Sequence, residues 1–179
     1  YYTENLESLL SIIKVSATDG AKSFIFSSSA TVYGETEEEC VNEETPLGIP
    51  LNPYGHTKSL GEQILKSGAH PFKTILLRYF NPVGAHPSAK IGELPIGIPN
   101  NLVPYITQTA AGLREKLTVF GSDYDTRDGS CIRDFIHVVD LAEAHVAALN
   151  YSEGMHENLD VFNVGTGAGN TVLELINTF

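Results

Sequence analysis

The order of apolar patterns along the chain restricts its fold more than any other feature. Apolar residues follow a helical spacing over residues 1–16, and a short run rich in aromatic and β-branched residues follows at 23–28. A second helical pattern begins at Pro53, which can open a helix at its first position, and a second strand-like run covers 74–79. Because strands that alternate with helices form parallel sheets covered by helices, the sequence predicts an α/β fold.

The second half of the chain continues this alternation after two loops. An acidic loop is predicted at 29–52, and the abundance of proline and glycine in 81–100 indicates a long irregular loop. The remaining patterns predict helices at 102–113, at 139–149 and from Thr171, strands at 117–120, 134–137 and 161–164, and a polar turn region at 121–130. Residues 165–169, Gly-Thr-Gly-Ala-Gly, lack the lysine of a P-loop and predict a tight connection from strand to helix.

The charge and the cysteine content exclude several classes of partner. The net charge of −11 argues against a nucleic acid, because phosphate neutralisation needs clustered lysine and arginine. No apolar run reaches the ~18 residues that cross a bilayer, so no membrane partner is expected. Cys40 and Cys131 show neither metal-ligand spacing nor a disulfide framework, and six glutamates within 35–44 are typical of a solvated loop. These features predict a cytoplasmic protein without a metal site.

Both ends of the sequence have the pattern of an interrupted helix. The chain begins at Tyr1 without a methionine, inside a helical pattern, and it stops at Phe179 inside another. It is therefore expected to be an interior piece of a longer protein and to be inactive in isolation.

Tyr54 and Lys58 are the pair of side chains that most strongly indicates a chemical function. They are four residues apart in a predicted helix, so they share one face of that helix. A free tyrosine has a pKa near ~10, and a neighbouring cation favours the phenolate and predicts a lower pKa. Such a tyrosine can take up and return a proton near neutral pH. The spacing alone also fits a surface helix that carries an incidental lysine.

Ser29 directly follows the first predicted strand. The carboxyl end of a strand in an open parallel sheet is where ligands bind, and a hydroxyl there can hydrogen-bond a reacting oxygen. A simple turn is the alternative for this serine-rich stretch. However, Tyr54 and Lys58 follow Ser29 by 25 and 29 positions. The three residues together resemble the three-part site of the short-chain dehydrogenase/reductase superfamily.

Five motifs extend this resemblance across nearly the whole chain. They are SSSATVYG at 27–34, NPYGHTK at 52–58, LRYFNPVGAHP at 77–87, GIPNNL at 97–102 and RDFIHV at 133–138. In this order they resemble the UDP-galactose 4-epimerase family of the extended superfamily, and they look closest to its fungal members. The resemblance implies part of a Rossmann-type doubly wound parallel sheet and part of a smaller substrate-binding domain. Residues 1–98 would form the C-terminal half of the NAD-binding domain with the catalytic residues. Residues 99–179 would form part of the UDP-sugar-binding region, with some elements returning to the NAD-binding domain.

The resemblance also implies an activity and a set of contacts. The family interconverts UDP-galactose and UDP-glucose by NAD-dependent oxidation at the sugar C4 and return of the hydride, with NAD as a bound cofactor. Tyr54 would be the acid/base, Ser29 would hold the C4 oxygen, and Lys58 would bind the nicotinamide ribose. Cofactor contacts are implied for Lys58, Tyr54, Ser29, Phe80 and Tyr79. Substrate contacts are implied for Asn81, Asn100, Asn101, Leu102, Thr118, Val119, Phe120 and Arg133. The family is commonly homodimeric, so a homodimer is expected.

Structural explanations stand beside several of these roles. The asparagines at 100–101 could cap a helix, Arg133 could form an ion pair with Asp134, and Phe120 could belong to the core. The sequence also departs from the family pattern: Glu4 and Ser8 stand where an asparagine and a glycine are usual. The glycine-rich turn that cradles the NAD pyrophosphate does not occur in it.

Two other functions remain open on the sequence alone. One is a sugar-nucleotide dehydratase or decarboxylase on the same scaffold, and the other is a cofactor-binding regulatory homologue. A dehydratase needs an acid beside the serine, whereas Ala30 and Thr31 follow Ser29 here. A regulatory homologue typically loses the tyrosine or the lysine, and this chain keeps both. The sequence therefore favours epimerisation.

Overall fold

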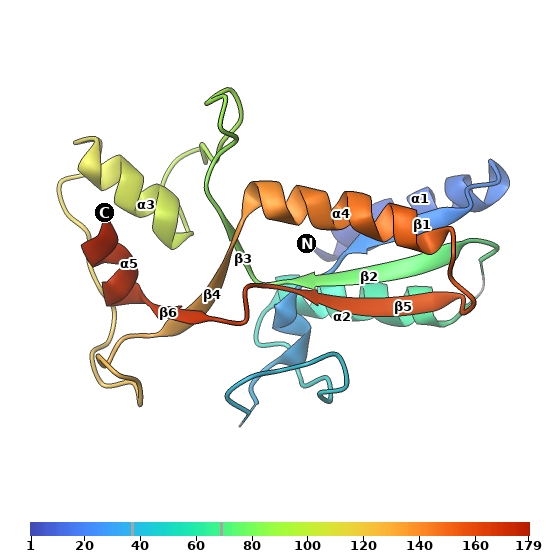
Figure 1. The fold of residues 1–179 in the computed structure, drawn as a ribbon, viewed down its shortest axis with the longest axis horizontal. Helices are drawn as coiled ribbons and strands as arrows, with labels where there is room; N and C mark the ends of the chain where they lie inside the picture. Colours follow the sequence, from blue (N-terminus) through green and yellow to red (C-terminus); the bar gives the residue numbers. More distant parts are fainter. Residues whose placement is uncertain (37, 69) are drawn as a thin grey trace. The chain divides into compact units, whose positions relative to one another are not determined.

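The computed structural model describes residues 1–36, 38–68 and 70–179. Their contacts divide the chain into two compact units (Figure 1). Unit 1 comprises Tyr1–Phe80 and Leu141–Val164, and unit 2 comprises Asn81–Asp140 and Gly165–Phe179. Each unit is therefore assembled from two separate stretches of the sequence.

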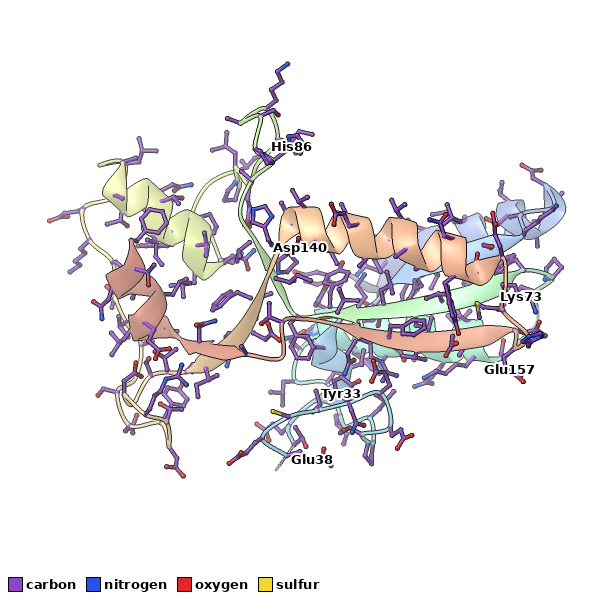
Figure 2. All side chains as sticks on the ribbon, in the orientation of Figure 1. Tyr33, Glu38, Lys73, His86, Asp140 and Glu157 are labelled. Carbon is purple, nitrogen blue, oxygen red and sulfur yellow. The ribbon has the colours of Figure 1, made fainter. Side chains whose placement is uncertain are left out.

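Unit 1 contains a three-stranded parallel sheet. Its elements are a π-helical turn (Thr3–Glu7), α1 (Ser8–Thr18), β1 (Ser23–Ser27), a 3-10 helix (Ala30–Tyr33), α2 (Pro53–Lys66), β2 (Lys73–Tyr79), most of α4 (Val138–Ser152) and β5 (Leu159–Val164). The central strand is β2, which pairs in parallel with β1 and with β5. Figure 2 shows Lys73 and Glu157 together at the start of β2, where Lys73 Nζ donates to Glu157 O at 3.2 Å. The predicted α/β fold with a parallel sheet is thus confirmed.

Helices cover both faces of this sheet because the side chains of β2 alternate between them. Leu76 packs on one face against Leu65 of α2, with Ile13 of α1 beside them. Ile75 and Leu77 point to the other face, in the cluster that includes Ala148 of α4. Figure 1 shows α2 and α4 on opposite sides of β2 and β5. The sheet is therefore doubly wound, as the resemblance implied.

Helix α2 begins where the sequence predicts it. Asn52 is the N-cap, its side chain accepts a hydrogen bond from Gly55 N at 2.8 Å, and Pro53 opens the helix. The short 3-10 helix is capped in the same way by Ser29, whose Oγ accepts from Thr31 N at 3.3 Å. Two caps thus fix the backbone at Ser29 and immediately before Tyr54.

Unit 2 is built around a small mixed sheet. Its elements are β3 (Asn81–Val83), α3 (Leu102–Ala110), β4 (Ile132–His137), β6 (Gly169–Thr171) and α5 (Val172–Thr178). Strand β4 pairs in parallel with β3 and antiparallel with β6. Thr171 and Glu174 form a reciprocal capping box that begins α5.

Three local expectations for unit 2 are wrong. Residues 117–120 form no strand, because they have no pairing partner among the described residues. Strand β3 lies inside the stretch predicted to be an irregular loop, and β6 begins within the predicted tight connection at 165–169 and extends to Thr171, the predicted start of the helix. The glycine-rich turn before β6 is held by Asp134, whose carboxylate accepts from the backbone N–H of Thr166 and of Gly167 (both 2.9 Å).

In the part of the chain that the structure describes, no helix is long and apolar enough to cross a membrane. Within the same residues, no group of three or more His, Cys, Asp and Glu side chains is placed to hold a metal ion.

Gly34 follows the 3-10 helix and approaches another segment closely. Its φ is +65°, and an added Cβ would lie 2.6 Å from Ile49 O. Gly34→Ala is expected to lower the free energy of unfolding by about 1–3 kcal/mol for its backbone conformation, φ +65° with ψ −145°, which glycine adopts far more readily than other residues, plus the cost of displacing Ile49. Urea unfolding of the whole protein would measure this loss. Gly20→Ala is the matched control, since Gly20 has φ +74° and nothing within 4 Å of the added Cβ. Equal losses in both variants would contradict the role of the close approach.

Candidate functional site

Unit 1 brings Ser29, Tyr54 and Lys58 together at the carboxyl end of β1. The Ser29 side chain lies near enough to the Tyr54 hydroxyl to lower its pKa. Lys58 Nζ donates to Ser27 O at 2.8 Å and lies 5.5 Å from the centre of the Tyr54 ring. The serine comes from the loop after β1, and the tyrosine and lysine come from one face of α2. A hydroxyl, a phenol and an ammonium therefore converge at one place.

Burial governs the titration of Tyr54 and Lys58. It raises the pKa of Tyr54, the neighbouring Tyr79 and Tyr1 raise that pKa further, and the Ser29 side chain lowers it in part. Burial also lowers the pKa of Lys58. The sequence predicted a lowered pKa for Tyr54, and this prediction is wrong for this chain by itself, because the pKa is raised. The phenol is therefore protonated at neutral pH.

Aromatic and polar side chains surround this group. Tyr79 ends β2, and its ring centre lies 6.4 Å from that of His145. His145 Nε2 in turn forms a hydrogen bond of 2.9 Å with Ser27 Oγ. Phe80 follows Tyr79 and donates its backbone N–H to Val164 O at 3.2 Å. Tyr79 and Phe80 are both half-buried.

The unusual Glu4 lies on the surface of the protein. Its side chain is exposed, as is that of Ser8. Asn5, the next residue, donates from Nδ2 to Thr57 Oγ1 of α2 at 2.9 Å. The asparagine thus ties the first helical turn to α2, and the carboxylate of Glu4 lies in solvent.

Unit 2 contains a separate cavity of about 460 Å³. Its volume falls within the ~300–1,000 Å³ typical of small-molecule sites. All eight residues for which substrate contacts are implied line it: Asn81, Asn100, Asn101, Leu102, Thr118, Val119, Phe120 and Arg133. Residues from four places in the sequence therefore meet around one space.

The contacts around the cavity bear on the structural explanations for three of these residues. Asn101 stands at the N-cap of α3 but does not cap it, because its side chain donates instead to Glu93 Oε1 at 2.8 Å. Arg133 forms no ion pair with the described residues and donates to Ile132 O at 2.7 Å. Phe120 is 84% exposed and does not belong to the core. The amides at the start of α3 and one guanidinium thus border the cavity, which suits an anion.

Several residues that line the cavity were not predicted from the sequence. Among them are Glu93, Tyr124, Ser130, Cys131, Val172 and Ile176. Cys131 stands two residues before Arg133, so the alternation of an extended segment could have indicated it. Val172 and Ile176 are four apart on α5, a helical spacing that could have indicated a shared face.

The pattern of one protein family matches almost the entire sequence. Residues 1–165 match the family described as NAD dependent epimerase/dehydratase. The chain belongs to this family. The family match covers all of unit 1 and the part of unit 2 that precedes β6.

Individual relatives agree with the family and with the resemblance to UDP-galactose 4-epimerases. UDP-glucose 4-epimerase 2 of Arabidopsis thaliana is 50% identical over the full chain, which covers 52% of that protein. The bifunctional protein GAL10 of Pachysolen tannophilus is also 50% identical over the full chain, which covers 27% of it. Plant and yeast relatives thus match equally well, so identity does not favour the fungal members expected from the motifs.

A solved structure shows the same fold. The crystal structure of UDP-glucose 4-epimerase from Bifidobacterium longum, a complex with NAD+ and UDP, is 49% identical in sequence and superposes with a TM-score of 0.91. The comparison covers 99% of this chain and 53% of that one. The chain spans about half the length of the single-function epimerases that it matches.

Proposed function

We propose that the whole protein is an isomerase that interconverts UDP-galactose and UDP-glucose by reversible oxidation at the sugar C4. The observation that carries this proposal is the convergence of Ser29, Tyr54 and Lys58 at the end of β1. Relatives of about 50% identity that are UDP-glucose 4-epimerases support it. The reaction needs a group that moves a proton and a group that holds the sugar oxygen, and this site contains both.

The residues around Lys58 fit NAD as the cofactor. An ammonium has three N–H donors, and among the described residues Ser27 O accepts one of them. The other two suit the ribose hydroxyls of a nicotinamide nucleotide. Lys58, Tyr54, Ser29, Tyr79 and Phe80 would hold its nicotinamide end. When bound, NAD would accept the hydride from C4 and would give the hydride back to the other face of the sugar.

The side chains of this chain would manage the proton. Ser29 Oγ would hydrogen-bond the C4 oxygen and keep it close to the Tyr54 hydroxyl. Tyr54 would take the proton from the C4 hydroxyl as the 4-keto sugar forms, and would return it on reduction. Because burial raises the pKa of Tyr54, its phenolate needs a stabilising positive charge before it can act as a base near neutral pH. Lys58 lies near enough to contribute part of that charge.

The cavity of unit 2 would bind the nucleotide part of the substrate. Arg133 and the amides at the start of α3 would hold the diphosphate, and residues 118–120 would hold uracil. Asn81, Asn100, Asn101 and Leu102 would complete the site. We assign 1–98 to the NAD-binding domain and 99–179 to the UDP-sugar-binding region, with α4 and β5 returning to the NAD-binding domain. A cytoplasmic homodimer is the assembly expected for the whole protein.

Arg133→Met is expected to weaken UDP binding by about 10- to 100-fold, because a charge-assisted hydrogen bond is worth ~1.5–3 kcal/mol. Isothermal titration of the whole protein with UDP would measure the change. Arg127→Met is the matched control, since Arg127 belongs to the same unit, pairs with Glu174 and does not line the cavity. Equal weakening in the two variants would argue against a diphosphate contact at Arg133.

The product of the reaction tests the proposed function. Purified whole protein incubated with UDP-galactose is expected to form UDP-glucose, resolved by anion-exchange chromatography, without net consumption of NAD. Release of a 4-keto-6-deoxy sugar nucleotide would instead indicate a dehydratase. UDP binding without turnover would indicate a regulatory homologue.

A further inference from the structure

A buried ion pair lies beneath the catalytic residues of unit 1. Glu62 of α2 and Arg78 of β2 are only 0% and 2% exposed. Arg78 Nε donates to Glu62 Oε1 at 2.9 Å and Nη2 donates to Glu62 Oε2 at 2.7 Å. The pair is bidentate and joins the helix that carries Tyr54 to the central strand of the sheet.

A pair of this kind calls for an explanation other than stability. The free energy lost when two charges are removed from water is about as large as the free energy gained from their attraction. Apolar residues of similar size therefore often stabilise a fold equally well. Burial by itself would raise the pKa of Glu62, but hydrogen bonds from Arg78, Ser28 and Lys66 hold that pKa below its usual range. Glu62 is therefore charged at neutral pH, and its oxygens are strong acceptors with fixed directions.

The neighbours of the pair indicate what it holds. Ser28 Oγ donates to Glu62 Oε1 at 2.7 Å, and Ser28 is fully buried. Arg78 Nη1 donates to the Tyr33 hydroxyl at 3.0 Å, and this hydroxyl donates to Asn163 Oδ1 at 2.7 Å. Tyr33, labelled in Figure 2, ends the 3-10 helix that Ser29 begins. Glu62 and Arg78 thus bind the two ends of the segment 28–33, which carries Ser29.

We infer that the Glu62–Arg78 pair is a positioning device that sets the place of Ser29 relative to Tyr54. Glu62 stands eight residues after Tyr54 on α2, so the same helix carries the acid/base and the anchor of the Ser29 segment. The inference rests on the proposed function for the roles of Ser29 and Tyr54. Ser28 and Tyr33 are positioning residues in this scheme, since their bonds to the pair fix the segment.

Ser28→Ala and Tyr33→Phe in the whole protein test the inference, because each releases one end of the segment and leaves the ion pair in place. Each variant is expected to lower kcat for UDP-galactose by about 10- to 100-fold, with KM changed less than about twofold. The physical reason is that a small displacement of Ser29 weakens contacts made in the transition state and leaves nucleotide binding intact.

Lys66→Ala is the matched control. Lys66 Nζ also donates to Glu62 Oε2, at 3.0 Å, but its side chain is 37% exposed and makes no hydrogen bond to the segment. Its kcat is expected to stay at the wild-type value. An equal fall of kcat in Lys66→Ala, or unchanged kcat in both Ser28→Ala and Tyr33→Phe, would overturn the inference.

Amide hydrogen exchange gives a readout that does not depend on activity. Val32 N–H donates to Ser29 O and Gly34 N–H donates to Thr31 O, so both amides report on the segment. Their exchange is expected to be faster in Ser28→Ala and in Tyr33→Phe than in Lys66→Ala. Wild-type protein without epimerase activity would refute the proposed function. The exchange rates would then still decide whether the pair holds the segment: faster exchange supports this, and unchanged exchange overturns it.

Discussion

Tyr54→Phe is expected to lower the turnover of the whole protein by about 10²- to 10⁴-fold, the usual contribution of a positioned acid/base. The change removes one hydroxyl, which lies near the Ser29 side chain, and keeps the ring that lies 5.5 Å from Lys58 Nζ. UDP affinity is expected to stay at the wild-type value, because the cavity of unit 2 contains no part of Tyr54. Initial rates with UDP-galactose and titration with UDP would measure the two quantities.

Tyr151→Phe is the matched control for this prediction. Tyr151 belongs to the same unit, and its hydroxyl donates to Asp160 Oδ2 at 2.8 Å on an exposed surface. Loss of this hydroxyl is expected to leave turnover within about twofold of wild type, as is usual for surface substitutions. Wild-type turnover in Tyr54→Phe would show that Tyr54 is not the acid/base.

The fold could be predicted where periodic patterns were long enough. Strand β2 has seven residues and was expected within one residue of its bounds, and α2, with fourteen residues, begins at the predicted Pro53. Strands β3 and β6 have three residues each, which is too short to show an alternation. Residues 117–120 are rich in strand-forming types but have no pairing partner among the described residues, since β-propensity depends on its surroundings. Strand pairing depends on residues that are far apart in the sequence, so a local pattern cannot predict it.

The sequence predicts which residues form the candidate site, but it does not predict their pKa values. Tyr54 and Lys58 share a face because they are four apart, and Ser29 joins them because it lies in the loop that follows β1. Spacing indicates which groups are neighbours, but it does not give the loss of solvation, which raises the pKa of Tyr54. Glu62 and Arg78 illustrate the same limit. Each looks like an ordinary charged residue of a helix or strand, and only their tertiary pairing allows both to be buried.

Glu62→Met is expected to lower the free energy of unfolding by about 3–5 kcal/mol, because it leaves the guanidinium of Arg78 buried without its partner. Urea unfolding of the whole protein at neutral pH would measure the loss. The loss is also expected to depend on pH. Since the folded state lowers the pKa of Glu62, its stabilising effect is present above the ordinary carboxyl pKa of ~4.3 and fades as the pH falls through the lower folded value. The difference between wild type and variant should therefore narrow in acid.

The double variant Glu62→Met/Arg78→Met separates the two functions that the pair could have. Without either charge no unpaired ion is left in the interior, and stability is expected to recover to within about 1–2 kcal/mol of wild type. If the pair only stabilised the fold, activity would recover with stability. If it positions Ser29, turnover stays low in a stable protein, because Ser28 and Tyr33 have lost the acceptor and the donor that fixed them. Lys66→Met, which removes an exposed partner of Glu62, is expected to cost no more than about 1 kcal/mol. A double variant that is stable and fully active would show that neither charge is needed at this site.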